Sequence, residues 1–216
     1  MFNPLDLLFP RSNAHHSSIS NYLTPAEITS LPAKFKPLTK SQNKVLESIF
    51  VASPYSNYLV QDLINRVKLE GETAIIESLS DLIYRQIFIE ANYFVPDPDI
   101  LVPVAADPRR ELVRGFSLQH SLAKQLAQRI ENSQYHDILR KPESTRPQSE
   151  LDRKERLKNL KHSFELVPTP PSFSDAEILW LLDDITTTGT TLTENARVLK
   201  RAYPFLKIHG ITVAGN

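Results

Sequence analysis

One stretch decides the fold of this chain: Leu181-Leu182-Asp183-Asp184-Ile185-Thr186-Thr187-Thr188-Gly189-Thr190-Thr191-Leu192. An apolar run leads into two adjacent carboxylates, a hydroxyl-rich turn with one glycine, and an amphipathic run from 192 to 203. This order predicts a strand, an acidic strand end, a tight turn and a helix. The N–H groups of the turn and the helix N-terminus favour an anion, and the carboxylates can accept hydrogen bonds from sugar hydroxyls or hold a divalent metal ion through water. The pattern indicates a sugar-phosphate site, with an ordinary strand-to-helix turn and good N-caps as the alternative.

The bulk composition fits a globular chain and excludes several classes. The 216 residues are 41% hydrophobic and 23% charged, with a formal net charge of zero, which argues against a strongly basic nucleic-acid surface. The chain has no cysteine, so disulfides and thiolate zinc sites are excluded. Its start lacks the features of a signal peptide, and no apolar run approaches the ~18 residues of a membrane span. We expect a cytoplasmic protein without a membrane partner.

Strand-like and helical patterns alternate after residue 44. We expect strands at 45–52, 100–105, 177–185 and 207–214, and helices at 58–67, 72–87, 117–130, 149–161 and 191–203. This alternation predicts an α/β fold, a parallel sheet with helices on both faces, whose ligands gather at the carboxyl ends of the strands. Residues 1–44 are expected to form an irregular N-terminal extension, and 45–216 the domain.

Three arginines follow the second expected strand. Arg109, Arg110 and Arg114 lie just beyond the run from 100 to 105, at the edge where ligands are expected. Arginine can bind two phosphate oxygens at once, so the cluster suits a polyanion such as pyrophosphate. A solvated loop with surface arginines is the alternative.

The acidic strand end and its turn resemble the phosphoribosyl-pyrophosphate (PRPP) motif of type I phosphoribosyltransferases. That motif has an apolar strand, two aspartates and a Thr-Thr-Gly turn, and its fixed places are filled here by Asp183, Asp184, Ile185, Thr187, Thr188, Gly189 and Thr191. Many members have a second glycine where this chain has Thr190, whose Cβ lies near the expected phosphate.

A longer series of motifs resembles the competence protein F family, which has a phosphoribosyltransferase-like fold and acts in bacterial DNA uptake. The matching residues are Val102-Pro103-Val104, Arg114-Gly115-Phe116, Thr145, Gln148, Leu151, Arg156, Asn159, Phe164 and the acidic turn, and the stretch from 58 to 71, with Lys68, is similar as well. Taken by itself, the run from 151 to 164 would be a charged surface helix.

The resemblance implies a set of roles. Asp183 and Asp184 would bind the ribose hydroxyls and support Mg²⁺ without ligating it directly. The 5′-phosphate would lie in the turn, pyrophosphate on the second strand end, and a mobile segment would cover both. The implied residues are Thr187, Thr188, Gly189, Thr190 and Thr191 for the phosphate, Pro103, Val104, Ala105, Arg109 and Arg114 for pyrophosphate, and Arg146 and Arg156 for the cover.

The family's N-terminal cysteine zinc module is absent here. Residues 1–44 therefore resemble a degenerate remnant of it, in which His15 and His16 without thiolates make a poor zinc site. Two functions stay open: transfer of phosphoribosyl from PRPP to an unidentified nitrogen acceptor, or non-catalytic PRPP or nucleotide binding by a partner of DNA-uptake proteins or single-stranded DNA. Pairing of two copies into a homodimer is also left open.

Overall fold

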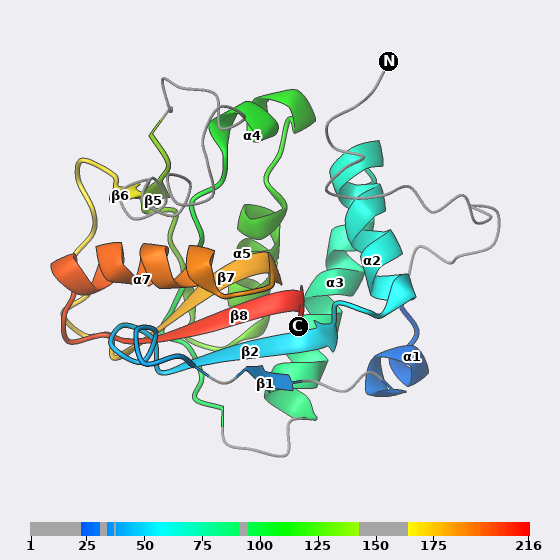
Figure 1. Cartoon of the computed structure of the whole chain (residues 1–216), viewed down its shortest axis with the longest axis horizontal. Helices are drawn as coiled ribbons and strands as arrows, with labels where there is room; N and C mark the ends of the chain where they lie inside the picture. The colour runs from blue at the N-terminus through cyan, green and yellow to red at the C-terminus, as the bar shows by residue number, and fades with distance from the viewer. Residues whose placement is uncertain (1–22, 31–33, 37, 91–94, 143–163) are drawn as a thin grey trace.

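The computed structural model describes residues 23–30, 34–36, 38–90, 95–142 and 164–216, and within them a six-stranded sheet in the order β1-β2-β8-β7-β3-β4 forms the centre (Figure 1). Five neighbouring strands, from β2 to β4, are parallel, and the edge strand β1 is antiparallel. The strands are β1 (Lys34–Lys36), β2 (Ser48–Pro54), β3 (Ile100–Pro103), β4 (Gln134–Tyr135), β7 (Ile178–Thr186) and β8 (Lys207–Gly215). A separate antiparallel pair consists of β5 (Leu139–Arg140) and β6 (Glu165–Leu166).

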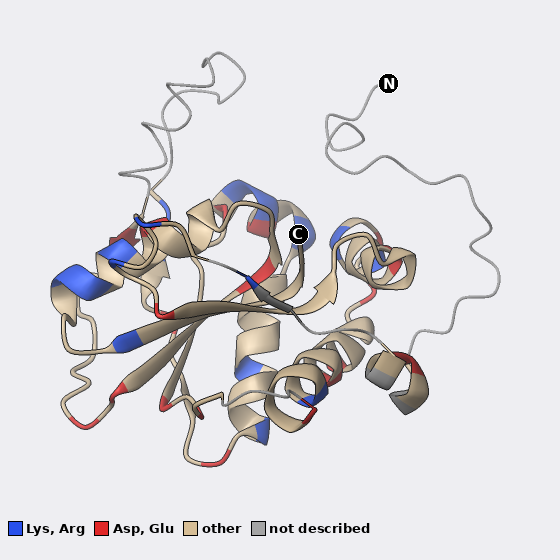
Figure 2. Cartoon of the chain, turned by 60° about the horizontal axis from the view of Figure 1, so that its bottom comes forward, with Lys and Arg blue, Asp and Glu red and all other residues tan. Residues whose placement is uncertain are grey.

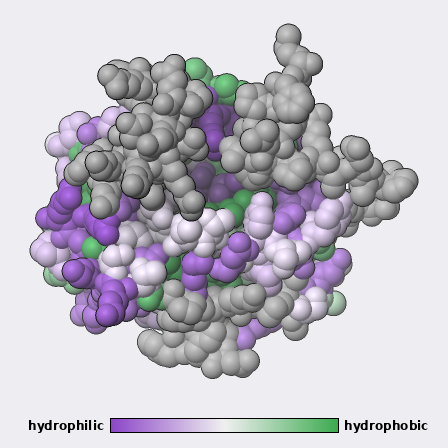
Figure 3. All heavy atoms as spheres, in the orientation of Figure 1, coloured by the Kyte–Doolittle hydropathy of each residue, from purple (hydrophilic) through white to green (hydrophobic). Residues whose placement is uncertain are grey.

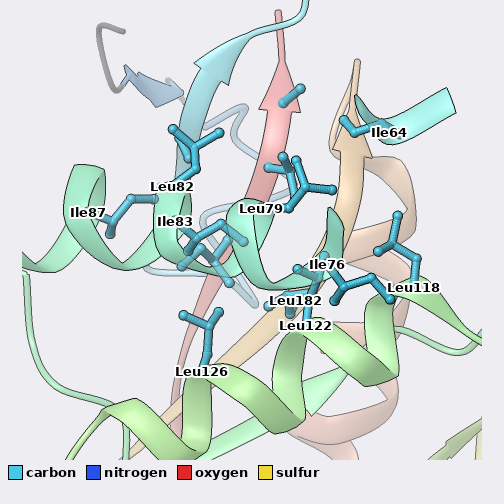
Figure 4. Close-up of a cluster of buried hydrophobic side chains, with 14 of the residues drawn as sticks. Ile64, Ile76, Leu79, Leu82, Ile83, Ile87, Leu118, Leu122, Leu126 and Leu182 are labelled. Carbon is cyan, nitrogen blue, oxygen red and sulfur yellow. The ribbon is translucent and has the colours of Figure 1, made fainter. Parts of the chain in front are cut away.

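Helices cover both faces of this sheet. The helical elements of the described residues are α1 (Pro25–Ser30), α2 (Tyr58–Asn65), the π-helical turn η2 (Arg66–Glu70), α3 (Ile75–Ile83), the π-helical turn η3 (Tyr84–Ile89), α4 (Pro108–Arg114), α5 (Leu118–Arg129) and α7 (Thr190–Ala202). On one face, α2, α3 and α5 pack on the sheet through side chains such as Ile64, Leu79 and Leu122, in one cluster with Leu182 of β7 (Figure 4). On the other face, α7 packs through Leu192, Ala196 and Leu199.

The two long central strands have the composition of buried parallel strands. In β7 the run from Leu179 to Asp184 is buried, and in β8 every residue after Lys207 is buried. Parallel strands that are covered by helices on both faces have nearly continuous apolar sequences, and β7 and β8 fit this description. Because β2, β3, β7 and β8 run in the same direction, their carboxyl ends meet at one edge of the sheet, and the apolar end of β3 lies beside the acidic end of β7 there.

The predicted fold class, a parallel α/β sheet with helices on both faces, is confirmed. The four expected strands correspond to β2, β3, β7 and β8, and four of the expected helices begin or end within a few residues of observed ones. The expectation of an irregular region before residue 44 was wrong for its later part, because α1 forms there and β1 pairs with β2. The expected helix at 149–161 lies outside the described residues.

None of the helices among the described residues is long and apolar enough to cross a lipid bilayer. The outer surface over α7 is largely hydrophilic (Figure 3), as expected for a helix that buries one side on the sheet and carries Lys200 and Arg201 in its last turn.

Candidate functional site

The two aspartates lie at the buried carboxyl end of β7. Asp183 and Asp184 are each only 6% exposed, and the N–H of Asp184 donates to Oδ1 of Asp183 at 2.9 Å. Both carboxylates line the same cavity at the sheet edge. The strong apolar run of the sequence thus forms a strand that places two buried acids near its carboxyl end, where they line the cavity.

Neighbouring groups reduce the negative charge of this acid pair. Nζ of Lys68, on η2, lies 2.7 Å from Oδ2 of Asp184. Burial and the charge of Asp184 raise the pKa of Asp183 to about 7, although Lys68 and hydrogen bonds from the Asp184 N–H and the Gln119 side chain oppose this rise. The pair can therefore bind a proton near neutral pH, and it gains from any cation or hydrogen-bond donor that a ligand brings.

The turn after β7 has the geometry of an anion site. Gly189 adopts a left-handed conformation (φ 76°) at the N-cap of α7, a helix of 13 residues. Within the part of the chain that the structure describes, the main-chain N–H groups of Thr187, Thr188 and Gly189 have no hydrogen-bond partner. Unpaired N–H groups at a helix N-terminus favour a phosphate.

Two side chains from the N-terminal part of the chain hold this turn from behind. Nζ of Lys36 donates to the carbonyl oxygen of Thr187 at 2.6 Å, and Nε2 of Gln42 donates to that of Thr188 at 2.9 Å. Because two successive carbonyls are fixed in this way, the orientation of the following peptide N–H groups is fixed as well. Lys36 and Gln42 therefore support the turn although they lie far from it in the sequence.

The segment at the end of β3 is expected to bind pyrophosphate. Pro103 has no N–H, the N–H of Val104 donates to the Leu182 carbonyl at 2.9 Å, and that of Ala105 donates to Oδ1 of Asn195 at 3.1 Å. These two amides donate inside the protein, although Val104 and Ala105 line the cavity; the assignment of Pro103, Val104 and Ala105 to pyrophosphate stays a prediction. The next residue, Ala106, also lines the cavity, and its N–H has no partner among the described residues.

The arginines lie on α4, a helix that the sequence did not predict. Asp107 caps it by accepting from the N–H of Arg109 at 3.1 Å. Arg110 and Arg114 line the cavity, whereas the exposed Arg109 is not among the lining residues. Burial and the neighbouring Arg110 lower the pKa of Arg114, and Asp184 raises it. The cationic side of the site is therefore built by Arg110 and Arg114, one turn of helix apart.

These parts enclose one cavity of about 670 Å³. It brings together the acid pair, Thr187, Thr191, the segment from Val104 to Asp107, and the two arginines; Thr188, Gly189 and Thr190 form the turn behind Thr187. Its charged lining is balanced, with four basic side chains (Lys68, Arg110, Arg114 and Lys141) and four acidic ones (Asp107, Glu111, Asp183 and Asp184). Lys141 and Asp107 form an ion pair at 3.3 Å.

Several predicted residues cannot be placed. Arg146 and Arg156, expected to cover the site, and His15 and His16 lie outside the described residues. Among the described residues, no group of three or more His, Cys, Asp or Glu side chains could hold a metal ion. A magnesium ion at the acid pair would therefore need ligand oxygens and water to complete its shell, which is how Mg²⁺ commonly binds beside phosphates.

Sequence reasoning missed four contributors to the site: Lys68, Lys36, Gln42 and Asn195. Lys68 lies in the stretch from 58 to 71 that resembles the competence protein F family, but the residues around it in the sequence do not show that its amine reaches Asp184. Asn195 lies in the middle of α7, and its side chain is fully buried. A buried amide indicates a specific hydrogen-bond role, but the sequence did not show that Asn195 lies on the buried face of this helix. It ties the segment after β3 to the first turn of α7, because it accepts from the Ala105 N–H and also donates to the Thr191 carbonyl at 2.9 Å.

Comparisons with known proteins support the resemblance. No family model matches the chain. It is 28% identical over 140 residues to Competence protein F of Haemophilus influenzae and 26% identical over 140 residues to the DNA utilization protein YhgH of Salmonella typhi; each match covers 64% of this chain. The predicted resemblance to competence protein F is thus confirmed at the level of homologous relatives, although the match spans only 61% and 60% of their lengths.

Two solved structures are also similar. One is the xanthine-guanine-hypoxanthine phosphoribosyltransferase of Helicobacter pylori, with a TM-score of 0.37 and 14% identity, where the match covers 64% of this chain and 71% of the other. The second is the AQ2163 protein of Aquifex aeolicus, with a TM-score of 0.35 and 10% identity over 77% of this chain and 87% of the other.

Proposed function

We propose that this protein binds PRPP together with Mg²⁺ in the cavity at the carboxyl edge of its sheet, and that it transfers the phosphoribosyl group to a nitrogen acceptor. The names of the two curated relatives add a proposed setting, the uptake or use of DNA. The observation that carries the proposal is the shared cavity: the acid pair, the threonine turn and the α4 arginines line one space of about 670 Å³.

The dimensions and chemistry of this space suit a phosphorylated pentose with a second anionic group. The 5′-phosphate would accept hydrogen bonds from the N–H groups of Thr187, Thr188 and Gly189 and the hydroxyls nearby. The ribose hydroxyls would donate to Asp183 and Asp184. Pyrophosphate would lie towards Ala106, Arg110 and Arg114, since a guanidinium can bind two phosphate oxygens at once.

The balanced charge of the cavity supports a role for the metal ion. Four basic and four acidic side chains leave little net positive charge for a ligand that carries several negative charges. A divalent cation that arrives with the pyrophosphate would supply the missing charge, and when bound it would stabilise the leaving group. The protein's own residues would fix the sugar between the acids and the turn, neutralise the departing pyrophosphate from α4, and keep the anomeric carbon facing the acceptor.

The alternative is a PRPP or nucleotide-binding module that works with single-stranded DNA and catalyses nothing. Basic and acidic residues are interspersed over the helices (Figure 2), and the net charge of the chain is zero. Both features weaken a broad DNA-binding surface, for which a basic stripe is typical. We therefore favour catalysis.

Calorimetry with PRPP and Mg²⁺ tests the site, and a pyrophosphate assay with a panel of nucleobases tests the reaction. In the double variant Asp183→Asn/Asp184→Asn, we expect PRPP affinity to fall at least about 100-fold, because two charge-assisted hydrogen-bond acceptors are lost, while the circular dichroism spectrum is unchanged. Unchanged PRPP affinity in this variant would refute the site. Binding without base-dependent pyrophosphate release would favour the module over the enzyme.

A further inference from the structure

The acid pair already has a cation of its own. Nζ of Lys68 lies 2.7 Å from Oδ2 of Asp184, and the two side chains are only 8% and 9% exposed. A contact of this kind at the protein surface is worth little, but here both charges are withdrawn from water. The lysine amine thus occupies one side of the carboxylate that a metal ion would otherwise approach.

The backbone of Lys68 is held in place from several sides. Val67 is fully buried, and the guanidinium of Arg66 binds both carboxylate oxygens of Glu72 at 3.0 and 2.6 Å. The π-helical turn then ends at Gly71 in a left-handed conformation (φ 75°). π-Helical turns are rare in proteins, and those that occur often lie at functional sites. The lysine therefore reaches Asp184 from a supported position and not from a free loop.

A buried ammonium group at this place affects a divalent cation in two ways. It uses an oxygen of Asp184 that could ligate the ion, and it repels the ion over a short distance in a medium of low dielectric constant. Among the described residues, Asp184 forms the ion pair with Lys68 and Asp183 forms none with a lysine. One or two carboxylates without phosphate oxygens bind Mg²⁺ weakly.

We infer that Lys68 is the resident counter-cation of Asp183 and Asp184, which keeps divalent metal out of the ligand-free site so that the metal enters only together with the phosphorylated sugar. This inference rests on the proposed function for its second half. Its first half, weak metal binding by the free protein because of Lys68, can be tested without any sugar phosphate.

The test is a titration of the ligand-free protein with Mn²⁺, a paramagnetic substitute for Mg²⁺, followed by electron paramagnetic resonance. We expect weak binding by the wild-type protein and binding at least about tenfold tighter by Lys68→Met, because one positive charge beside the acids is removed. Lys68→Gln, which can still donate a hydrogen bond to Asp184, should show the same gain. The matched control is Lys141→Met, which removes a lysine that lines the same cavity but pairs with Asp107; it should change the affinity less than about threefold.

Three results would overturn the inference. One is tight Mn²⁺ binding by the wild-type protein; another is an unchanged Mn²⁺ affinity in folded Lys68→Met and Lys68→Gln; a third is an equal gain in Lys141→Met. Adding Asp184→Asn to Lys68→Met should abolish the gain, and a gain that persists would place the metal elsewhere. If wild type fails to bind PRPP with Mg²⁺ while the Mn²⁺ gain is seen, the proposed function fails and the role of Lys68 as counter-cation stands.

Discussion

The two walls of the cavity are built in different ways. The wall formed by β7, the threonine turn and α7 rests on buried side chains and is tied from behind by Lys36 and Gln42. The wall formed by α4 buries none of its residues, and its Leu112 and Val113 are 85% and 87% exposed. The first wall is preorganised for a group of fixed shape, whereas the second can adjust to what binds beside it.

Two glycines with the same backbone conformation give the sharpest test of this difference. Gly189 and Gly115 have φ angles of 76° and 75°, but a Cβ on Gly189 would lie 2.6 Å from Nε2 of Gln42, whereas a Cβ on Gly115 would meet no atom within 4 Å. We expect Gly189→Ala to lower the free energy of unfolding by about 3 kcal/mol, from backbone strain and overpacking together, and Gly115→Ala by about 1 kcal/mol from strain alone. Urea unfolding measures both, and equal losses would contradict the difference between the walls.

The unfolding free energy measured at several pH values tests a buried histidine in the sheet, His209 on β8, the strand beside β7. Burial, with a smaller contribution from Lys207, lowers the pKa of His209 to about 4, and its Nδ1 lies 2.6 Å from the Ser48 hydroxyl. Between pH 6.5 and 4 the unfolded chain therefore binds more protons at this residue, so its contribution is complete above pH 6.5 and is lost as the pH falls towards 4. We expect a loss of about 1 to 3 kcal/mol in the unfolding free energy over this range relative to His209→Gln.

The comparison with His209→Gln is necessary because the titration of Asp183 changes the unfolding free energy in the opposite direction as the pH falls. Its pKa, raised to about 7, means that the folded state binds more protons than the unfolded state as the pH falls below 7. Subtracting the His209→Gln curve from the wild-type curve removes this contribution. A flat difference curve would show that His209 does not titrate differently in the two states.

Asn195 connects the segment after β3 with the first turn of α7, and its removal should have a smaller effect. Its fully buried amide accepts from the Ala105 N–H and donates to the Thr191 carbonyl. We expect Asn195→Ala to cost about 2 kcal/mol in unfolding free energy, since the buried Ala105 N–H is left without an acceptor, and to weaken the proposed binding of PRPP. Asn195→Asp keeps the acceptor for Ala105 and should retain more of the affinity. Calorimetry and urea unfolding with both variants separate the two contacts, and a loss below about 0.5 kcal/mol in Asn195→Ala would contradict a structural role.

The smallest change is expected on α4. Leu112→Ser should alter the unfolding free energy by no more than about 0.5 kcal/mol, because an exposed side chain gives up little buried area. Leu192→Ala, in the fully buried face of α7, is the matched control and should cost about 3 kcal/mol. Thermal unfolding measures both, and a large loss in Leu112→Ser would mean that α4 packs as firmly as the opposite wall.

The sequence predicted the central part of the fold because its signals there are local. The apolar run of β7, the two acids at its end and the amphipathic pattern of α7 follow one another directly along the chain, and the structure has them in that order. The same holds for β2, β3, β8 and α5. α4 was missed because its seven residues bury nothing, so that no hydrophobic period marked it.

By itself, the sequence determined that two carboxylates, a threonine-rich turn and a helix N-terminus come together at a strand end, since neighbours in the chain remain neighbours in space. Only the tertiary structure decided what surrounds them. Gln42 holds a turn that lies 146 residues further along the chain, and Lys68, on the helical turn η2, neutralises an aspartate on β7. The physical reason is that such contacts depend on how the helices and strands pack, because no local pattern specifies which distant side chain will reach a buried charge.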